Sequence, residues 1–187
     1  MSSNILSEVY DVSKFGLIFV GAQKNMGPAG VTVIIIREDL IVSADESVPT
    51  MFNYKTHADK SSMFNTPPTF PIYVCGLVFE WIISIGSVIC IQKINEEKAA
   101  ILYDFLDESK IFSGTVVKKD RSLMNVPFIT GDADLDAQFI KEAGKRGLVN
   151  IKGHRSVGGM RASIYNAMPV DGVKTLVEFM KDFETGR

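Results

Sequence analysis

The chain has 187 residues, and 46% of them are hydrophobic, which is enough to bury a core of ordinary size. Its 20 lysine and arginine residues nearly balance its 22 aspartate and glutamate residues. A protein that binds nucleic acid through its phosphates usually carries a broad basic surface. The composition therefore favours a globular protein and argues against nucleic acid as a partner.

The two cysteines, Cys75 and Cys90, lie in an apolar stretch without the CxxC or Cys/His spacing of a zinc site. They indicate buried thiols rather than a disulfide framework. The two histidines are too few for a dense metal site, so no metal is expected. The segment after Met1 lacks the basic start and apolar run of a secretory signal. We therefore expect a cytoplasmic protein.

The first half of the chain begins with two apolar runs that predict strands. Residues 16–20 and 31–36 are short and apolar, and a turn-forming Gly-Pro-Ala-Gly sequence at 27–30 separates them. The second run does not alternate with polar residues, so we expect a strand covered on both faces, as in an α/β layer architecture. Residues 41–71 then show little periodicity and predict a long irregular connection, a kind of segment that is usually functional.

A long apolar stretch at residues 72–91 raises the question of a membrane. It is long enough to span a bilayer, but Glu80 lies near its middle and Gly86 interrupts it. A buried core or interface helix has the same pattern, so we expect no membrane. The alternative, a membrane anchor, predicts that the protein sediments with membranes. We expect a helix that begins at Pro71, breaks near Gly86 and resumes through 95–106.

The break near Gly86 divides the chain into two predicted domains, residues 1–85 and residues 86–187. Strands alternate with helices in the second domain, which makes it α/β or α+β. Acidic residues begin the first of its later helices, basic residues end it, and Gly147 can cap it. The predicted elements are a strand at 123–129, a helix at 132–146, strands at 148–151 and 160–165, and a helix at 170–183.

The first candidate for chemistry is Lys24, which follows the end of the first predicted strand beside glycines that let a ligand approach the backbone. A lysine in such a place can form a Schiff base with an aldehyde cofactor if part of its population is neutral. The alternative is an ordinary solvated lysine in a loop, and the spacing alone does not separate the two.

The second candidate is the sequence Asn65-Thr66-Pro67-Pro68. Amide, hydroxyl and backbone N–H groups beside two rigid prolines can hold a phosphate, because the prolines restrict the loop before the anion arrives. The same four residues also form an ordinary turn ahead of a helix. Both interpretations remain open on these residues alone.

The third candidate is a group of cationic side chains, His154, Arg155 and Arg161, around the flexible pair Gly158-Gly159. Guanidinium groups suit carboxylate and phosphate oxygens, so this segment predicts a small anionic substrate. A solvated basic turn is the alternative. His57 and Lys55 are weaker candidates and fit surface loop residues better, and the sequence contains neither a P-loop nor a dinucleotide-binding GxGxxG.

Three segments in this order resemble the phosphoserine aminotransferase family, and the likeness covers almost the full chain. They are DVSKFGLIFVGAQKNMGPAGVTVIIIR, NTPP and KGHRSVGGMRASIYNA. The resemblance implies an α/β fold, the C-terminal part of a fold type I PLP-dependent transferase. Residues 1–85 would then end the large cofactor-binding domain, and residues 86–187 would form the small C-terminal α/β domain.

The resemblance also implies the roles of the candidate residues. Lys24 would bind the cofactor, pyridoxal 5'-phosphate, through a Schiff base, and Gln23 would contact its phosphate. Asn65 and Thr66 would reach across a homodimer interface to the cofactor phosphate of the neighbouring subunit, so that active sites are shared. Arg161 would bind the α-carboxylate of the substrate. His154 and Arg155 would help to hold the substrate phosphate.

The implied reaction exchanges an amino group between L-glutamate and 3-phosphohydroxypyruvate to give phosphoserine and 2-oxoglutarate, in serine biosynthesis. One departure bears on it. In the family an Ala-Asp precedes the Met-Ser-Ser-Asn with which this chain begins, and that aspartate contacts the pyridine nitrogen. We therefore expect a C-terminal fragment without that aspartate and the stacking aromatic residue. The alternative is an inactive remnant that serves as a folded scaffold or pairs with an intact subunit.

Overall fold

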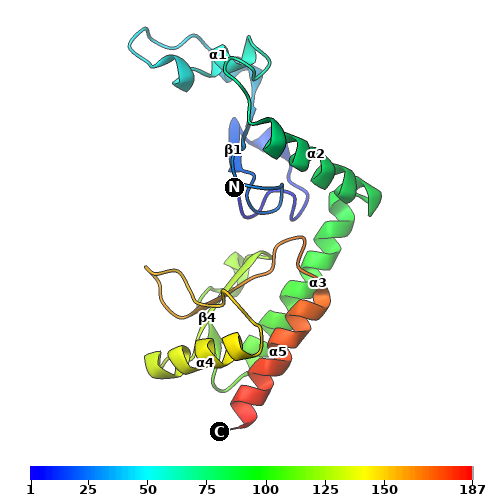
Figure 1. The fold of residues 1–187 in the computed structure, drawn as a ribbon, viewed down its shortest axis with the longest axis vertical. Coiled ribbons are helices and arrows are strands. Elements are labelled where there is room, and N and C mark those ends of the chain that lie inside the picture. The colour runs from blue at the N-terminus through cyan, green and yellow to red at the C-terminus, as the bar shows by residue number, and fades with distance from the viewer. Residues whose placement is uncertain (187) are drawn as a thin grey trace.

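The computed structural model describes residues 1–186, and in it two small antiparallel sheets are joined through a pair of long helices (Figure 1). The first sheet pairs β1 (Leu17–Gly21) with β2 (Thr32–Ile36), so that Leu17 lies opposite Ile36 and Gly21 opposite Thr32. The strand, loop and strand expected from the sequence are confirmed.

The expectation that the second strand is covered on both faces is wrong for this chain. Ile34 and Ile35 of β2 remain 37% and 42% exposed, and Phe19 of β1 is 62% exposed. The apolar run gave the strand correctly, but β2 has only β1 as a neighbour in its sheet, so too little of the described chain packs against it. The buried part of this region is a small cluster of Ile5, Ile18, Val20, Ala22, Met26 and Cys75.

The segment that follows β2 is irregular, as expected, and extends away from the rest of the chain at the top of Figure 1. Its regular pieces are single turns of helix. They are the 3-10 helices Glu38–Leu40 and Thr50–Phe52 and the short helix α1 (Tyr54–Ala58). Side chains in this segment are mostly exposed.

Two helices, α2 (Thr69–Ser84) and α3 (Ser87–Glu108), connect the two sheets. The break falls at Gly86, whose φ of 102° is a left-handed conformation that suits glycine, and the two axes differ by 81°. The predicted break is confirmed, although α3 resumes at once rather than near residue 95. Within the described residues no single helix is both long and apolar enough to span a membrane, and only this bent pair passes the same criteria together.

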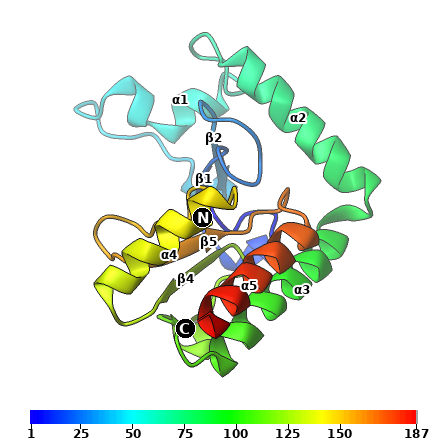
Figure 2. The same ribbon diagram turned by 60° about the horizontal axis from the view of Figure 1, so that its bottom comes forward.

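The second sheet has the order β3-β4-β5, with both pairings antiparallel. Figure 2 shows α3 and α5 side by side next to this sheet, with α4 crossing nearer the viewer. The remaining elements are a 3-10 helix at Val12–Lys14, β3 (Ser113–Gly114), a 3-10 helix at Lys118–Asp120, β4 (Asn125–Ile129), α4 (Ala133–Lys145), β5 (Met160–Ser163) and α5 (Val170–Thr185).

The helices predicted at 132–146 and 170–183 are confirmed as α4 and α5. Asp132 caps α4, because its carboxylate accepts hydrogen bonds from the backbone N–H groups of Asp134 and Leu135. The strand predicted at 148–151 is wrong. Only Lys152 forms an isolated bridge, opposite Met160, since the chain turns into a tight glycine loop before a ladder can extend.

The core of the C-terminal half contains phenylalanines whose rings pack edge to face between the second sheet and the helices. Phe112, Phe128 and Phe139 are essentially inaccessible. This core lies after residue 98 and the smaller one before residue 76. The exact division into domains at residues 85 and 86 stays a prediction.

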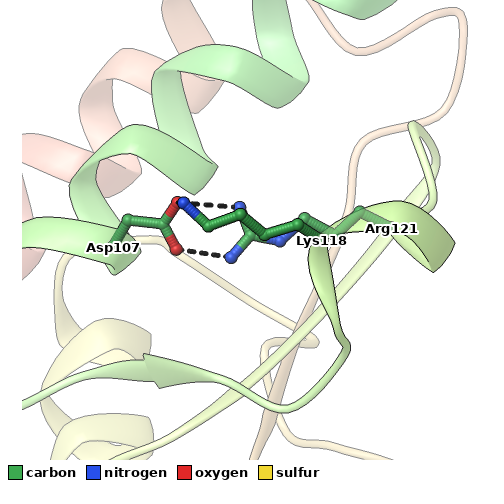
Figure 3. Close-up of polar contacts among 3 residues, drawn as sticks. All are labelled: Asp107, Lys118 and Arg121. Atoms are coloured by element: carbon green, nitrogen blue, oxygen red, sulfur yellow. Dashed lines mark hydrogen bonds and ion pairs between the residues drawn. The ribbon is translucent and has the colours of Figure 1, made fainter.

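An ion-pair cluster ties the end of α3 to the loop before β4 (Figure 3). Asp107 receives hydrogen bonds from both terminal nitrogens of Arg121, and the ammonium of Lys118 lies 2.9 Å from the same carboxylate. The Arg121 guanidinium also covers the ring of Tyr103, with 4.4 Å between its carbon and the ring centre. The hydrogen bonds from Arg121 and Lys118 hold the pKa of the Asp107 carboxyl well below its usual range.

Candidate functional site

Lys24 lies in a tight loop directly after β1. The loop closes on itself because the carbonyl of Ala22 accepts hydrogen bonds from the N–H groups of Lys24 and Gly27, at 2.7 and 2.9 Å. The Lys24 side chain is exposed, and its ammonium donates to the hydroxyl of Ser3 at 2.6 Å. The same nitrogen lies 5.8 Å from the ring centre of Tyr165, which follows β5. The amine is therefore accessible and held between two distant parts of the chain.

The neighbouring Asn25 is buried and anchors this loop. Its side-chain N–H₂ donates to the carbonyls of Ser3 and Ile5, each at 3.0 Å, while its oxygen accepts from the backbone N–H of Asn166 at 3.1 Å. A buried amide with partners on two distant segments restricts where the loop can lie. The position of Lys24 is thus determined by contacts that lie far from it in the sequence.

A small hollow of about 170 Å³ opens beside Lys24, lined also by Asn25, Gly27, Val78, Trp81, Asn166 and Ala167. Small-molecule sites usually enclose about 300–1,000 Å³. The described residues therefore form one wall of a candidate site rather than a complete pocket. Its chemistry nevertheless fits an aldehyde, since a primary amine is presented at the surface with hydroxyl and amide groups around it.

Gln23 is exposed, and its side chain folds back over Gly21. A Cβ on Gly21 would lie 2.3 Å from the Gln23 side-chain oxygen, so glycine gives this amide room to lie across the strand end. The amide is free to reach an anion placed above the loop.

Asn65 and Thr66 lie in the segment that extends away from the rest of the chain, and both are exposed. The Asn65 amide donates to the carbonyl of Thr66 at 3.3 Å, and neither residue lines the hollow beside Lys24. The structure does not bring this pair to the lysine of the same chain. His57 and Lys55 also behave as loop residues, with Lys55 paired to Asp59 at 2.9 Å.

His154 and Arg155 lie in an exposed loop that precedes β5. The loop is narrow at its base, where the N–H of Gly153 donates to the carbonyl of Gly159 at 2.8 Å, and a Cβ on Gly153 would lie 2.0 Å from the carbonyl oxygen of Gly158. The His154 ring nitrogen Nδ1 lies 2.6 Å from the hydroxyl of Ser156. No hydrogen bond or ion pair engages Arg155 within residues 1–186.

Arg161 lies on β5 and is partly buried. Its backbone N–H donates to the carbonyl of Ile151 at 2.7 Å, whereas its side-chain Nε is buried without a hydrogen-bond partner among the described residues. A buried guanidinium N–H without a partner is costly, and an anionic ligand would satisfy it. Arg161 also lies at the edge of a larger cavity of about 430 Å³, whose other lining residues from Gly147 to Leu176 are mostly apolar.

Sequence reasoning missed several residues that shape this site. Asn25, Asn95, Lys98 and Asn166 are all buried. A signal was present in α3, where Asn95 and Lys98 share the apolar face of Ile91, Leu102 and Leu106. A polar residue at a core position of a helix indicates a buried partner, and that signal identifies both Asn95 and Lys98.

Comparison with known proteins agrees with the motifs. The family described as aminotransferase class-V matches residues 1–176. A phosphoserine aminotransferase of Bacillus cereus is 60% identical over 184 residues, which cover 98% of this chain and 51% of that protein. One from Listeria monocytogenes is 58% identical over 187 residues and is likewise covered to 51%. The chain thus spans about half the length of the curated relatives it matches.

Solved structures give the same result. The phosphoserine aminotransferase from Bacillus circulans subsp. alkalophilus superposes with a TM-score of 0.97 at 45% identity, covering 100% of this chain and 52% of that one. A PLP-bound phosphoserine aminotransferase from Trichomonas vaginalis gives 0.91 at 41% identity, with 97% and 52% covered. The expected fold class, part of a PLP-dependent transferase fold, is confirmed. The chain belongs to the aminotransferase class-V family.

Proposed function

We propose that this chain is the lysine-bearing part of a phosphoserine aminotransferase, which transfers the amino group of L-glutamate to 3-phosphohydroxypyruvate with pyridoxal 5'-phosphate as cofactor. The observation that carries the proposal is the presentation of the Lys24 amine, exposed and held between Ser3 and Tyr165. The identity of 60% to a phosphoserine aminotransferase over nearly the whole chain supports this substrate class.

In this proposal Lys24 holds the cofactor and then carries a proton to and from the α-carbon of the substrate. When bound, pyridoxal phosphate supplies an electron sink for the negative charge that develops at that carbon. Ser3 orients the amine, because its hydroxyl already accepts from the Lys24 nitrogen at 2.6 Å. Gln23 would donate to the cofactor phosphate from the adjacent position in the loop.

The cationic residues of the second half would bind the substrate. The buried, unpartnered Nε of Arg161 suits a carboxylate, since a charged acceptor would satisfy it. His154 and Arg155 lie on the exposed loop beside it, where a substrate phosphate can be reached. Arg155 has no competing ion pair within residues 1–186, so its guanidinium is available for that phosphate.

We further propose a homodimer with shared active sites in a cytoplasmic setting. Asn65 and Thr66 are exposed and do not line the hollow at Lys24 of their own chain, which fits a role at the cofactor phosphate of a second copy. Apolar side chains of α2 also remain uncovered, with Phe70 70% and Tyr73 63% exposed. Exposed apolar surface of this kind is expected where another chain packs.

The test mixes the purified chain with pyridoxal phosphate, reduces the mixture with borohydride, and locates the modified residue by peptide mass spectrometry. We expect modification at Lys24 and its loss in Lys24→Ala. Lys93→Ala is the matched control, because Lys93 is an exposed lysine of α3 whose ammonium makes no hydrogen bond or ion pair within the described chain. Modification spread over exposed lysines, with none preferred at Lys24, would refute the assignment of the cofactor.

The transfer reaction is tested in a chimera in which this chain replaces the matching half of the Bacillus cereus relative. We expect formation of phosphoserine that Arg161→Lys weakens mainly through KM, because a lysine cannot present the same fork of donors. A chimera that binds cofactor but prefers a substrate without a phosphate would refute the proposed substrate class.

The second candidate function is a folded, noncatalytic partner of an intact subunit. The exposed apolar residues of β2 and α2 favour it, because they offer a surface for such a subunit. It predicts that the isolated chain associates with the full-length relative in analytical ultracentrifugation and adds no turnover. A chimera with activity close to that of the relative would exclude it.

A further inference from the structure

Lys98 of α3 is completely buried, and its ammonium pairs with no carboxylate of residues 1–186. It donates instead to three backbone carbonyls, those of Ile164, Tyr165 and Met168, at 3.1, 2.9 and 3.0 Å. All three carbonyls belong to the turn at 164–168 between β5 and α5. An ammonium has three N–H donors, so all three donors of Lys98 are used by carbonyls of one turn.

The turn at 164–168 depends on Lys98 for its shape. Among the described residues, one other hydrogen bond closes it between backbone groups, from the N–H of Met168 to the carbonyl of Tyr165, at 2.8 Å. An apolar side chain in place of Lys98 would remove the buried charge but would leave the three carbonyls without their donor. The Ile164 carbonyl is buried and those of Tyr165 and Met168 are partly buried, so losing their donor is unfavourable and the turn would move to reach other partners.

The same turn forms one side of the Lys24 site. The Tyr165 ring lies 5.8 Å from the Lys24 ammonium, and the N–H of Asn166 donates to the side-chain oxygen of Asn25 at 3.1 Å. Asn166 and Ala167 line the hollow beside Lys24. A shift of the turn would therefore move the loop that carries the lysine.

Asn95, one helical turn before Lys98, contacts the same assembly. Its side-chain N–H₂ donates to the carbonyl of Ser7 and to the side-chain oxygen of Asn166, both at 2.9 Å. The Asn166 amide in turn donates to the carbonyl of Leu6 at 2.9 Å. One face of α3 thus holds both the turn after β5 and the N-terminal segment that contacts Lys24.

We propose that Lys98, assisted by Asn95, is a positioning residue that sets the place of Lys24 relative to β5, the strand that carries Arg161. The proposal rests on the proposed function for the role of Lys24, and it adds a residue that never touches the cofactor. Lys98 acts through the turn at 164–168 and the buried Asn166–Asn25 contact. The ammonium is needed there because no apolar residue can hold three carbonyls at once.

The test compares Lys98→Met with Leu102→Ala. Leu102 lies one turn further along the same helix, is buried in the core, and has no side-chain hydrogen-bond donor, so its truncation destabilises the fold while every polar group of the network stays in place. Two readouts need no cofactor. One is hydrogen exchange of the Asn166 amide, and the other is the fluorescence of Trp81, the single tryptophan, which lines the hollow. The third is borohydride capture of pyridoxal phosphate on Lys24.

In Lys98→Met we expect exchange at Asn166 to rise by about tenfold or more, because the turn opens locally. The Trp81 emission should shift, and capture at Lys24 should fall severalfold at equal cofactor concentration. Leu102→Ala should lower Tm yet leave all three readouts near those of the unchanged protein, when each protein is measured equally far below its own Tm. Asn95→Ala should change them in the same direction as Lys98→Met, and it decides the test if Lys98→Met does not fold.

The proposal is overturned if Lys98→Met and Leu102→Ala change exchange and capture alike, since the role of Lys98 would then be stability alone. It is also overturned if Lys98→Met leaves the Asn166 amide protected. Failure of the proposed function looks different. The unchanged protein would then show no preferred capture at Lys24, while exchange and fluorescence would still decide whether Lys98 positions the loop.

Discussion

The burial of Lys98 predicts a pH dependence of stability that a single substitution should remove. Burial lowers the pKa of Lys98 from its ordinary 10.5 to about 8. Below pH 8 the lysine is protonated in the folded and unfolded states alike, so it contributes no pH dependence. Between these two pKa values the unfolded chain holds a proton that the folded chain has released. The free energy of unfolding therefore rises with pH through this window.

The size of the effect follows from the two pKa values. Their difference, at about 1.4 kcal/mol per pKa unit, corresponds to about 3 kcal/mol gained between about pH 8 and pH 10.5. Other lysines and tyrosines also titrate there, but they are common to the unchanged protein and to Lys98→Met. Their contributions cancel in the difference between the two proteins.

The assay is urea unfolding of both proteins at closely spaced pH values from about pH 7 to about pH 10.5. The difference between the free energies of unfolding of the unchanged protein and of Lys98→Met should grow by about 3 kcal/mol in favour of the unchanged protein between about pH 8 and about pH 10.5. Below about pH 8 this difference should change little. A difference that stays constant from one end to the other would refute the reasoning. It would mean that the three carbonyls stabilise the ammonium enough to cancel the effect of burial.

Two further predictions concern the loop before β5 and the ion-pair cluster. Gly153→Ala should destabilise the protein by about 1–3 kcal/mol in urea unfolding, because the new Cβ meets backbone oxygens on the other side of the loop. The matched control is Gly144→Ala in α4. Its new Cβ meets nothing within 4 Å, so it should stabilise the protein by about 0.4–1 kcal/mol. Equal effects of the two would contradict the close approach. Asp107→Asn should lower Tm at neutral pH. The difference in Tm from the unchanged protein should shrink as the pH falls from about 5 to about 2. The lowered pKa of Asp107 stabilises the fold only while the carboxylate is ionised, and this contribution is lost as it is protonated. A deficit independent of pH in thermal melts would argue against that ion pair.

Local sequence patterns predicted most of the elements correctly. The apolar face of 170–183 and the charges of 132–146 gave α5 and α4, because a helix buries residues at spacings of three and four. Gly86 marked the break between α2 and α3 because its φ of 102° is strained for other residues. The strand expected at 148–151 did not form; Leu148 and Ile151 pack on the core from a loop, whereas Val149 is exposed.

Among the candidate residues, too, the sequence predicted some features and not others. Motifs alone predicted Lys24, Arg161 and the exposed pair Asn65-Thr66, because each is carried by a short local segment. Sequence could not predict the partners of Lys24. Tyr165 lies 141 residues further along the chain, and only packing brings its ring to 5.8 Å from the lysine ammonium.

By itself the sequence determined the later helices, the first hairpin, the helix break at Gly86 and the candidate residues for chemistry, since these depend on neighbours within a few positions. Only the tertiary structure decided that β2 stays partly uncovered and where the buried amides meet. It also decided that Lys98 holds the turn behind Lys24. The physical reason is that a buried polar group is stable only when partners from distant segments satisfy it, and no local pattern specifies those partners.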